Sequence, residues 1–476
     1  MTPTVDDAAK KIHSLVGDQG FLGHDRNDHM HQVRDLLKQY GAADEDKIVS
    51  KLSDKDLHAL ADNVNSGGIF GQQGLNGGEK KDLFNNLAGK LDGNQLGRVA
   101  SAFSDRGDVT SLADSVAGFG SSQAKVDFIK SIAGAATSGD TQFDNGLFSN
   151  SLHMGDKEAI GIGKVLSSMK NDPTGVTAAI KALTPDQLAA VVKAGEGETV
   201  TTYSGFGIGD GGSSASTTYD PAGLRGVLDA AAASNDPAAK ASVFEAAAKA
   251  IGDIRGSDTL LTPNPGAGDA AKVVAEGMTN LLNSDTRGIV DQLNTADVNG
   301  KALTGYLQEV IRENPSATNP AIGRQIAQLQ GAGTGRTAAD FINTAEVGAN
   351  GDHFYRNAEN LGYYSGAMQA AINKMNADTK TQGDILTNVF TTAVSVGTTA
   401  VPTLSVPVKV GAQAFNGLTR EAVREVVADV TSGRKDLRDA LSDLALPRAP
   451  GQHDRSRGPA DPYFQSSANT VVLGNQ

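Results

Sequence analysis

The sequence predicts a mainly α-helical protein: diverged helical repeats, one inserted β-hairpin and a C-terminal helical module. Three observations indicate this fold class. Apolar residues recur at helical spacing through most of the chain, a series of short phrases occurs twice in the same order, and one segment places β-prone residues on both sides of a glycine-rich stretch. The small number of copies leaves open whether the repeats form a solenoid or a compact bundle.

The repeat is predicted from phrases that keep the same order in residues 91–183 and 183–296. The phrase that begins at Lys125 corresponds to the one at Lys240, and the phrase at Asp172 corresponds to the one at Asp285. Agreement in order across several such landmarks indicates a duplication. A partial copy over 52–90 precedes the two longer ones.

Helical spacing and capping residues define the helices within each copy. Leu224, Val227, Leu228 and Ala231 fall on one stripe with a period of 3.6 residues. Helix starts are predicted from capping side chains and from prolines at the first helical position, where the missing N–H costs nothing. These residues are Ser53, Asp108, Thr184 and Asp220, with Pro185 and Pro221.

One segment departs from the helical pattern. Residues 199–219 contain two arms rich in Thr, Ser, Tyr and Val around a glycine-rich stretch. This pattern predicts a projecting β-hairpin inserted into the second copy. Gly207-Ile-Gly-Asp-Gly-Gly212 also matches a dinucleotide-binding spacing, but a strand–loop–helix context is missing, so we interpret it as the tip of the hairpin.

The predicted organisation has five parts, with a change of style near residue 300. They are an N-terminal helical segment (1–50), a repeat domain (51–300), a polar connecting region (301–350), a C-terminal helical module (351–446) and a disordered tail (447–476).

Composition restricts the classes of partner and of chemistry. The chain has 476 residues, with 42 basic and 55 acidic side chains and a formal charge of -13. Such an acidic surface disfavours nucleic acid as a partner. The absence of Cys excludes disulfides and thiol chemistry. The first residues do not resemble a secretory signal peptide, so we expect either the bacterial cytoplasm or secretion by a route without one.

Candidate catalytic or metal-binding residues are few. His24, Asp28 and His31 form the densest group of potential metal ligands, but we favour a solvent-exposed helix start as their explanation. His353, Tyr355, Arg356 and Glu359 could be grouped as an acid–base patch, with nothing else in the sequence converging on it. The standard hydrolase, metalloprotease, phosphate-loop and kinase motifs are missing. The sequence therefore favours a non-enzymatic role without a cofactor, and leaves open an enzyme whose site is scattered along the chain.

Residues 385–415 are the most apolar stretch and are almost free of charge. Two hypotheses explain them: a buried helical hairpin, or a segment that contacts a membrane surface or a protein partner. The second hypothesis rests on eight apolar residues, namely Val389, Phe390, Val394, Val396, Val401, Leu404, Val406 and Val408.

The repeat phrases and Asn360-Leu-Gly-Tyr-Tyr364 resemble helical parts of Gly- and Ala-rich, secretion-associated proteins of Gram-negative bacteria. The composition is similar to that of harpins, without a shared motif. The resemblance implies a non-enzymatic bacterial effector or secretion-associated protein that acts through a protein partner. The alternatives are a membrane-active, toxin-like protein using residues 385–415 and an enzyme. The oligomeric state stays open.

Overall fold

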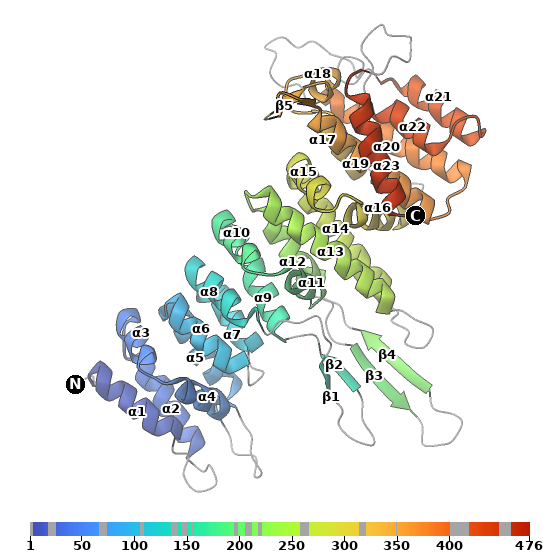
Figure 1. Cartoon of the computed structure of the whole chain (residues 1–476). Helices are drawn as coiled ribbons and strands as arrows, with labels where there is room; N and C mark the ends of the chain where they lie inside the picture. The colour runs from blue at the N-terminus through green and yellow to red at the C-terminus, as the bar shows by residue number, and fades with distance from the viewer. Residues whose placement is uncertain are drawn as a thin grey trace. The chain divides into compact units, whose positions relative to one another are not determined.

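The computed structural model describes most of the chain. The described residues are 3–17, 25–65, 74–104, 109–134, 141–143, 151–154, 157–194, 199–204, 212–217, 221–257, 266–313, 320–348, 350–399, 418–446 and 458–476. They are overwhelmingly helical, with a few short antiparallel strands that include the predicted hairpin, which confirms the all-α fold class (Figure 1).

The chain divides into two compact units. Unit 1 comprises Met1–Ala239 and Ile254–Ala270, and unit 2 comprises Lys240–Asp253 and Ala271–Gln476. This division differs from the predicted boundary near residue 300, because residues 271–300 belong with the C-terminal helices. Two helices contain residues of both units: α13 (Pro237–Ser257) and α14 (Ala267–Ser284).

Unit 1 contains helices α1 to α12. Their bounds are α1 Val5–Gly17, α2 Arg26–Lys38, α3 Ala42–Ser50, α4 Asp54–Val64, α5 Gly77–Lys90, α6 Gly93–Ser104, α7 Val109–Phe119, α8 Ser122–Ile132, α9 Lys157–Ser167, α10 Pro173–Lys181, α11 Pro185–Ala194 and α12 Pro221–Ala232.

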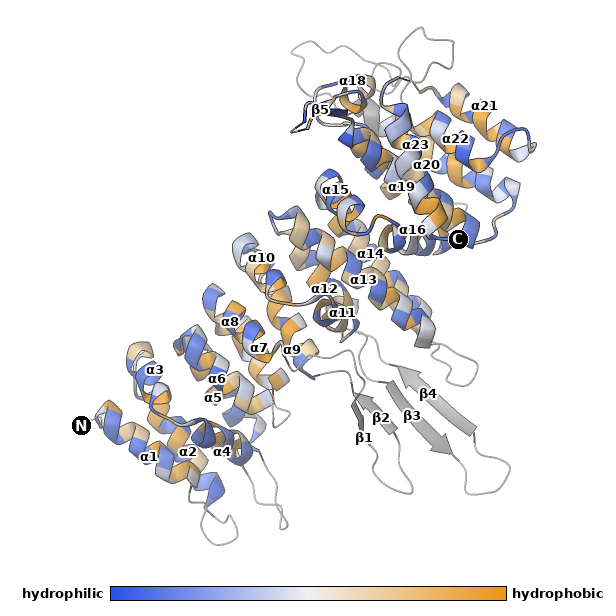
Figure 2. Ribbon diagram, in the orientation of Figure 1, coloured by the Kyte–Doolittle hydropathy of each residue, from blue (hydrophilic) through white to orange (hydrophobic). Residues whose placement is uncertain are grey.

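From α4 to α8, each helix of unit 1 packs mainly against the next helix but one along the chain, and α9 packs against both α11 and α12. Helices α4, α6, α8 and α10 contact one another in succession, and α5, α7, α9 and α12 do the same. The result is a stack of two helix rows, which Figure 1 shows for α5 to α10. Figure 2 shows that these helices carry both apolar and polar residues, so that neighbouring helices can cover the apolar side of each.

Capping residues behave as the sequence predicts where the structure describes them. Ser53 caps α4 in a reciprocal capping box with Asp56. Thr184 accepts from the backbone N–H of Gln187, whose side chain accepts from the N–H of Thr184. Asp108 and Asp220 lie outside the described residues.

The corresponding landmarks of the two long copies have matching local structure. Asp172 and Asp285 are the N-caps of α10 and α15 (Thr286–Ala296), and their carboxylates accept from Gly175 N and Gly288 N at 3.0 Å in both cases. Burial lowers the pKa of Lys125 and of Lys240, and a nearby capping carboxylate opposes the shift in each copy, Asp172 and Asp285 respectively. The duplication itself stays a prediction.

The predicted hairpin is present, and two further strands extend it. Strands β3 (Thr199–Ser204) and β4 (Gly212–Thr217) pair antiparallel, with Thr199 opposite Thr217. Strands β1 (Thr141–Phe143) and β2 (Ser151–Met154) add to β3 in the order β1-β2-β3-β4. The sequence missed these two strands because each is only a few residues long. Residues 205–211, with most of the glycine spacing, lie outside the described residues.

Unit 2 continues with α15 to α23 and one short hairpin. The bounds after α15 are α16 Lys301–Glu313, α17 Pro320–Leu329, α18 Ala338–Ile342, β5 Glu346–Val347, β6 His353–Phe354, α19 Arg356–Lys374, α20 Thr379–Thr399, α21 Arg420–Thr431, α22 Leu437–Ala445 and α23 Asp461–Gly474.

The centre of unit 2 is α19, which packs against α15, α16, α17, α18, α22 and α23. Leu361, Tyr363, Tyr364, Ala367 and Met368 are all fully buried, so this helix is covered on several sides. Its polar groups find partners: the Tyr363 hydroxyl donates to the backbone oxygen of Asp297.

The predicted polar connecting region, 301–350, is instead built of the packed helices α16, α17 and α18. Its polar appearance comes from residues that are buried in a hydrogen-bond network. Gln325 is fully buried, donates to Asn283 Oδ1 and Tyr306 Oη, and accepts from the Tyr364 hydroxyl. Satisfied polar groups of this kind are compatible with a core.

The predicted disordered tail is also wrong for its last part, because residues 461–474 form α23. This helix packs closely on α19, where Gly362 and Gly366 face it. A Cβ added at Gly362 would lie 2.2 Å from Phe464 O, and one at Gly366 would lie 2.5 Å from Ala468 O. The two glycines therefore permit backbone approach, and Phe464 and Ala468 are buried at this contact.

Candidate functional site

The predicted metal cluster does not assemble within the described part of the chain. His24 lies outside it, and Asp28 and His31 are on α2. His31 Nε2 lies 2.9 Å from Glu79 Oε1, the same carboxylate that completes the capping box of α5. No group of three potential metal ligands occurs among the described residues. His31 is thus held against a capping carboxylate.

The first half of the predicted contact segment 385–415, residues 385–399, lies in α20, and three of the predicted contact residues are buried there. Val389, Phe390 and Val394 are 1%, 0% and 4% exposed. Helix α20 packs against α17 and α21, which cover these side chains. Val396 is in α20, but its side chain is outside the described part. The remaining four predicted residues are not described either, namely Val401, Leu404, Val406 and Val408. None of the helices in the described ranges is long and apolar enough to cross a membrane.

Ser53, Asp56 and His13 superficially resemble a hydrolytic triad. Asp56 Oδ2 accepts from the Ser53 hydroxyl at 2.7 Å, and Asp56 Oδ1 lies 2.7 Å from His13 Nδ1. A catalytic triad needs the histidine between the serine and the carboxylate, so that the imidazole removes the hydroxyl proton. Here the carboxylate is in the middle. The cluster is a helix cap with an attached histidine.

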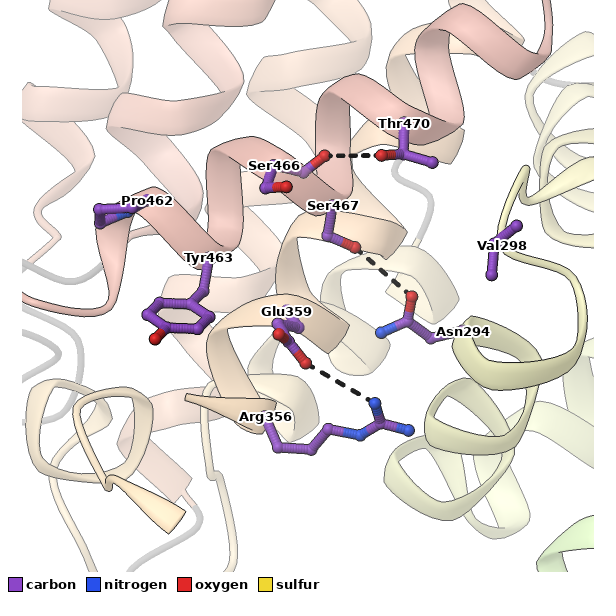
Figure 3. A pocket seen from close by; sticks show the side chains of 9 residues that line it. All are labelled: Asn294, Val298, Arg356, Glu359, Pro462, Tyr463, Ser466, Ser467 and Thr470. Carbon is purple, nitrogen blue, oxygen red and sulfur yellow. Dashed lines mark hydrogen bonds and ion pairs between the residues drawn. The ribbon is translucent and has the colours of Figure 1, made fainter. Parts of the chain in front are cut away.

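A hollow in unit 2 lies between α15, α19 and α23 and has a cavity volume of about 450 Å³ (Figure 3). We call it the α15–α19–α23 groove. Its volume lies in the range of small-ligand sites. Its lining comes from the end of α15 and the residues after it, from the start of α19, and from one face of α23. The lining residues are Asn294, Val298, Arg356, Glu359, Pro462, Tyr463, Ser466, Ser467 and Thr470.

Arg356 anchors the start of α19 to α15. Its Nε donates to Asp291 Oδ1 at 2.5 Å, and its Nη2 donates to the Asp291 backbone oxygen and to Thr295 Oγ1. Its Nη1 lies 3.6 Å from Glu359 Oε2. Burial alone would lower the pKa of Arg356, but the hydrogen bond to Asp291 and the charges of Asp291, Glu359 and Glu346 raise it overall.

Glu359 is the least satisfied charged group in the groove. The only polar contact of its carboxylate among the described residues is the 3.6 Å ion pair with Arg356, which is longer than a hydrogen bond. Its side chain is 27% exposed. The carboxylate therefore faces the groove with acceptor capacity that the described protein groups leave unused.

Helix α23 supplies the opposite wall. The Tyr463 hydroxyl donates to the His353 backbone oxygen at 2.7 Å, and the Tyr463 ring packs on Tyr355. Ser467 Oγ lies 3.5 Å from Asn294 Oδ1, which links this wall to α15 (Figure 3). These contacts fix the groove in a preformed shape.

The sequence indicates one wall of this groove but not the other. Arg356 and Glu359 lie near His353 in the sequence, and no other residues are predicted to converge on them. The structure supplies the missing residues from α23, which the sequence placed in a disordered tail. The Asp461-Pro462 pair at a helix start was the available signal.

Two hydroxyl groups of the lining have partners that are not catalytic bases. The Ser467 hydroxyl bonds an amide, the Thr470 hydroxyl bonds the Ser466 backbone, and within the lining neither is joined to a histidine or carboxylate base. Carboxylate, guanidinium, hydroxyl and amide groups are instead spread along its length. The sequence matches no known protein family, and it shows no significant similarity to any curated protein.

Proposed function

We propose that this protein is a non-enzymatic scaffold that binds a protein partner along the helical stack of unit 1. The observation that carries the proposal is the succession of contacts α4–α6–α8–α10 and α5–α7–α9–α12. Stacks of this kind use their helices for mutual support and leave an extended surface on which contact residues can vary.

Phe119 is the best candidate for a contact residue on this surface. It ends α7, is 58% exposed, and is the one exposed large hydrophobic residue identified among the described residues of unit 1. Aromatic side chains contribute a large share of binding energy at protein interfaces. Glycines surround it: Gly118 and Gly120 flank it, and its Cβ lies 3.7 Å from the Cβ position at Gly89. A partner can therefore approach closely.

The cellular setting is a further part of the proposal. A Cys-free, Gly-rich and acidic chain suits a bacterial effector or secretion-associated protein that crosses a membrane unfolded. The test is to measure tagged protein in the culture medium of a native host, with and without its signal-peptide-independent secretion apparatus. Equal amounts in both media, or none in either, would remove this part of the proposal.

The scaffold itself is tested with Phe119→Ser, with Val347→Ser as the matched control. Val347 is 65% exposed and lies on β5 in unit 2, so its loss should leave the stack unchanged. A partner would first be identified by cross-linking to the wild-type protein in its native host. The free partner would then be purified and titrated into each protein by calorimetry. We expect Phe119→Ser to weaken binding at least about ten-fold, since hot-spot residues contribute 2 kcal/mol or more. Equal affinity of all three proteins would contradict the proposed surface.

A further inference from the structure

We propose that the α15–α19–α23 groove binds a basic peptide segment, with Glu359 receiving the cationic group of a lysine or arginine side chain. This site is in unit 2 and goes beyond the proposed function, which concerns the helical stack of unit 1. Either one can therefore fail without the other.

The charges around the groove favour a cation. One guanidinium, that of Arg356, is surrounded by the carboxylates of Asp291, Glu359 and Glu346. Two helices, α19 and α23, begin at the groove, and the positive ends of their dipoles are each offset by an acid in the first turn, Glu359 and Asp461. The local sum is negative, so an anionic ligand would be repelled and a cationic one attracted.

Arg356 is committed to the protein, whereas Glu359 is open to a ligand. The Arg356 Nε and Nη2 atoms donate to Asp291 and Thr295, which leaves only Nη1, beside Glu359, for an incoming anion. Glu359 keeps only a 3.6 Å contact to Arg356 within the described structure. An ammonium or guanidinium group could donate hydrogen bonds to its carboxylate without breaking an existing one.

The site is preformed, which lowers the entropic cost of binding. On one side, Asn360 donates to Asp291 Oδ1 at 2.9 Å and accepts from Asn294 Nδ2 at 3.0 Å. On the other side, α23 is held against α19 at Gly362 and Gly366. These contacts fix the walls, and Asn294 is the one lining residue among them.

The lining extends beyond what a single small cation needs, which favours a peptide. Tyr463, Ser466 and Thr470 follow one another at helical spacing along α23, so their side chains run along the groove. Val298, 52% exposed, adds an apolar surface. A chain segment with a basic residue could place its cation at Glu359, its backbone along the hydroxyls and an apolar neighbour on Val298.

The test is a titration of the full-length protein with fluorescently labelled peptides, followed by polarisation at low salt. The probe has the sequence Ala-Leu-Ala-Lys-Ala-Ala with blocked ends. Three comparison ligands are the same peptide with acetylated lysine, the same peptide with Glu in place of Lys, and free butylammonium as an unlabelled competitor. The protein variants are Glu359→Gln, Ser466→Tyr to fill the groove, and Glu425→Gln as a charge-matched control on α21, far along the chain and exposed.

We expect saturable binding of the lysine peptide to the wild-type and Glu425→Gln proteins. Glu359→Gln should bind it at least about ten-fold more weakly, as expected for a lost charge-assisted hydrogen bond. Ser466→Tyr and acetylation of the lysine should each abolish binding.

Four outcomes would overturn the proposal: no binding to the wild-type protein, equal binding to Glu359→Gln, tighter binding of the Glu peptide, or butylammonium competing as strongly as the peptide. The last outcome would show a small-cation site in place of a peptide site. Ser466 is exposed, so Ser466→Tyr retains the fold and keeps the test informative if Glu359→Gln perturbs α19.

Discussion

The caps at corresponding positions of the two copies give the sharpest stability prediction. Asp172→Ala removes the acceptor for Gly175 N, which is worth about 1 kcal/mol in typical helices, with a range of about 0.5–2 kcal/mol. It also removes the acceptor for the Ser122 hydroxyl, the contact through which α8 is joined to the cap. A hydrogen bond to a charged group contributes about 1.5–3 kcal/mol when well shielded, and this site is partly exposed. We therefore expect unfolding to become easier by about 1.5–2.5 kcal/mol in total.

Asp285→Ala is the matched comparison. Asp285 caps α15 with the same 3.0 Å bond to Gly288 N, but no side-chain hydroxyl donates to it among the described residues. The expected loss is the cap alone, about 1 kcal/mol. Asp172→Asn should cost less than Asp172→Ala, because asparagine also caps helices. Ser122→Ala combined with Asp172→Ala should be less than additive, since both remove the same bond.

The assay is urea unfolding followed by circular dichroism, with the two units fitted as separate transitions if two appear. Hydrogen bonds from the Ser122 hydroxyl, the larger cause, and from Gly175 N hold the pKa of Asp172 below its usual value. Its contribution to stability is therefore present above the unfolded pKa and is lost as the pH falls through the folded one. Two results would refute the assignment of Asp172 as a cap. One is an Asp172→Ala protein with the same free energy of unfolding as the wild type, and the other is an Asp172→Asn protein that loses as much stability as Asp172→Ala.

Three further predictions concern packing and burial. Gly366→Val should lower stability by about 1–3 kcal/mol or more, because its Cβ would meet Ala468 O at 2.5 Å, whereas Gly305→Ala, which has nothing within 4 Å, should be neutral or stabilising in thermal melts. Burial raises the pKa of Glu45, so ionisation of this carboxyl opposes folding. The free energy of unfolding should therefore fall as the pH rises from the unfolded pKa of Glu45 through its folded pKa. Glu45→Gln should flatten this part of the pH–stability curve, and an unchanged curve would contradict the burial. Phe390→Ala should cost about 3–5 kcal/mol as a core truncation, and a cost below about 1 kcal/mol would place this side chain outside the core.

The predictable part of the fold is the part that local sequence determines. The helical spacing, the Ser53 and Thr184 caps and the β3–β4 hairpin depend on neighbours a few residues away, and each is present in the structure. The Asp172 and Asp285 phrases, selected as markers of repetition, are two caps with the same geometry.

The rest depends on contacts between residues far apart in sequence. Gln325 suggests a polar connector until Tyr364 and Asn283 are known to bond it in a core. The last helix, α23, has little helical preference of its own, and it is stabilised by packing against α19, where two glycines permit close backbone approach. The groove could not be predicted because Glu359 and Tyr463 line the same hollow only once α23 is placed against α19.

The central claim is that this protein acts by recognition on helical surfaces. Hydrogen–deuterium exchange of the full-length chain, with and without the native partner identified by cross-linking, tests it most directly. We predict that the partner slows exchange in the exposed turns around Phe119, at the end of α7. The Val347→Ser control should show the same protection. The partner should also be recovered chemically unchanged. Protection absent from unit 1, or a partner converted to a product, would contradict the claim.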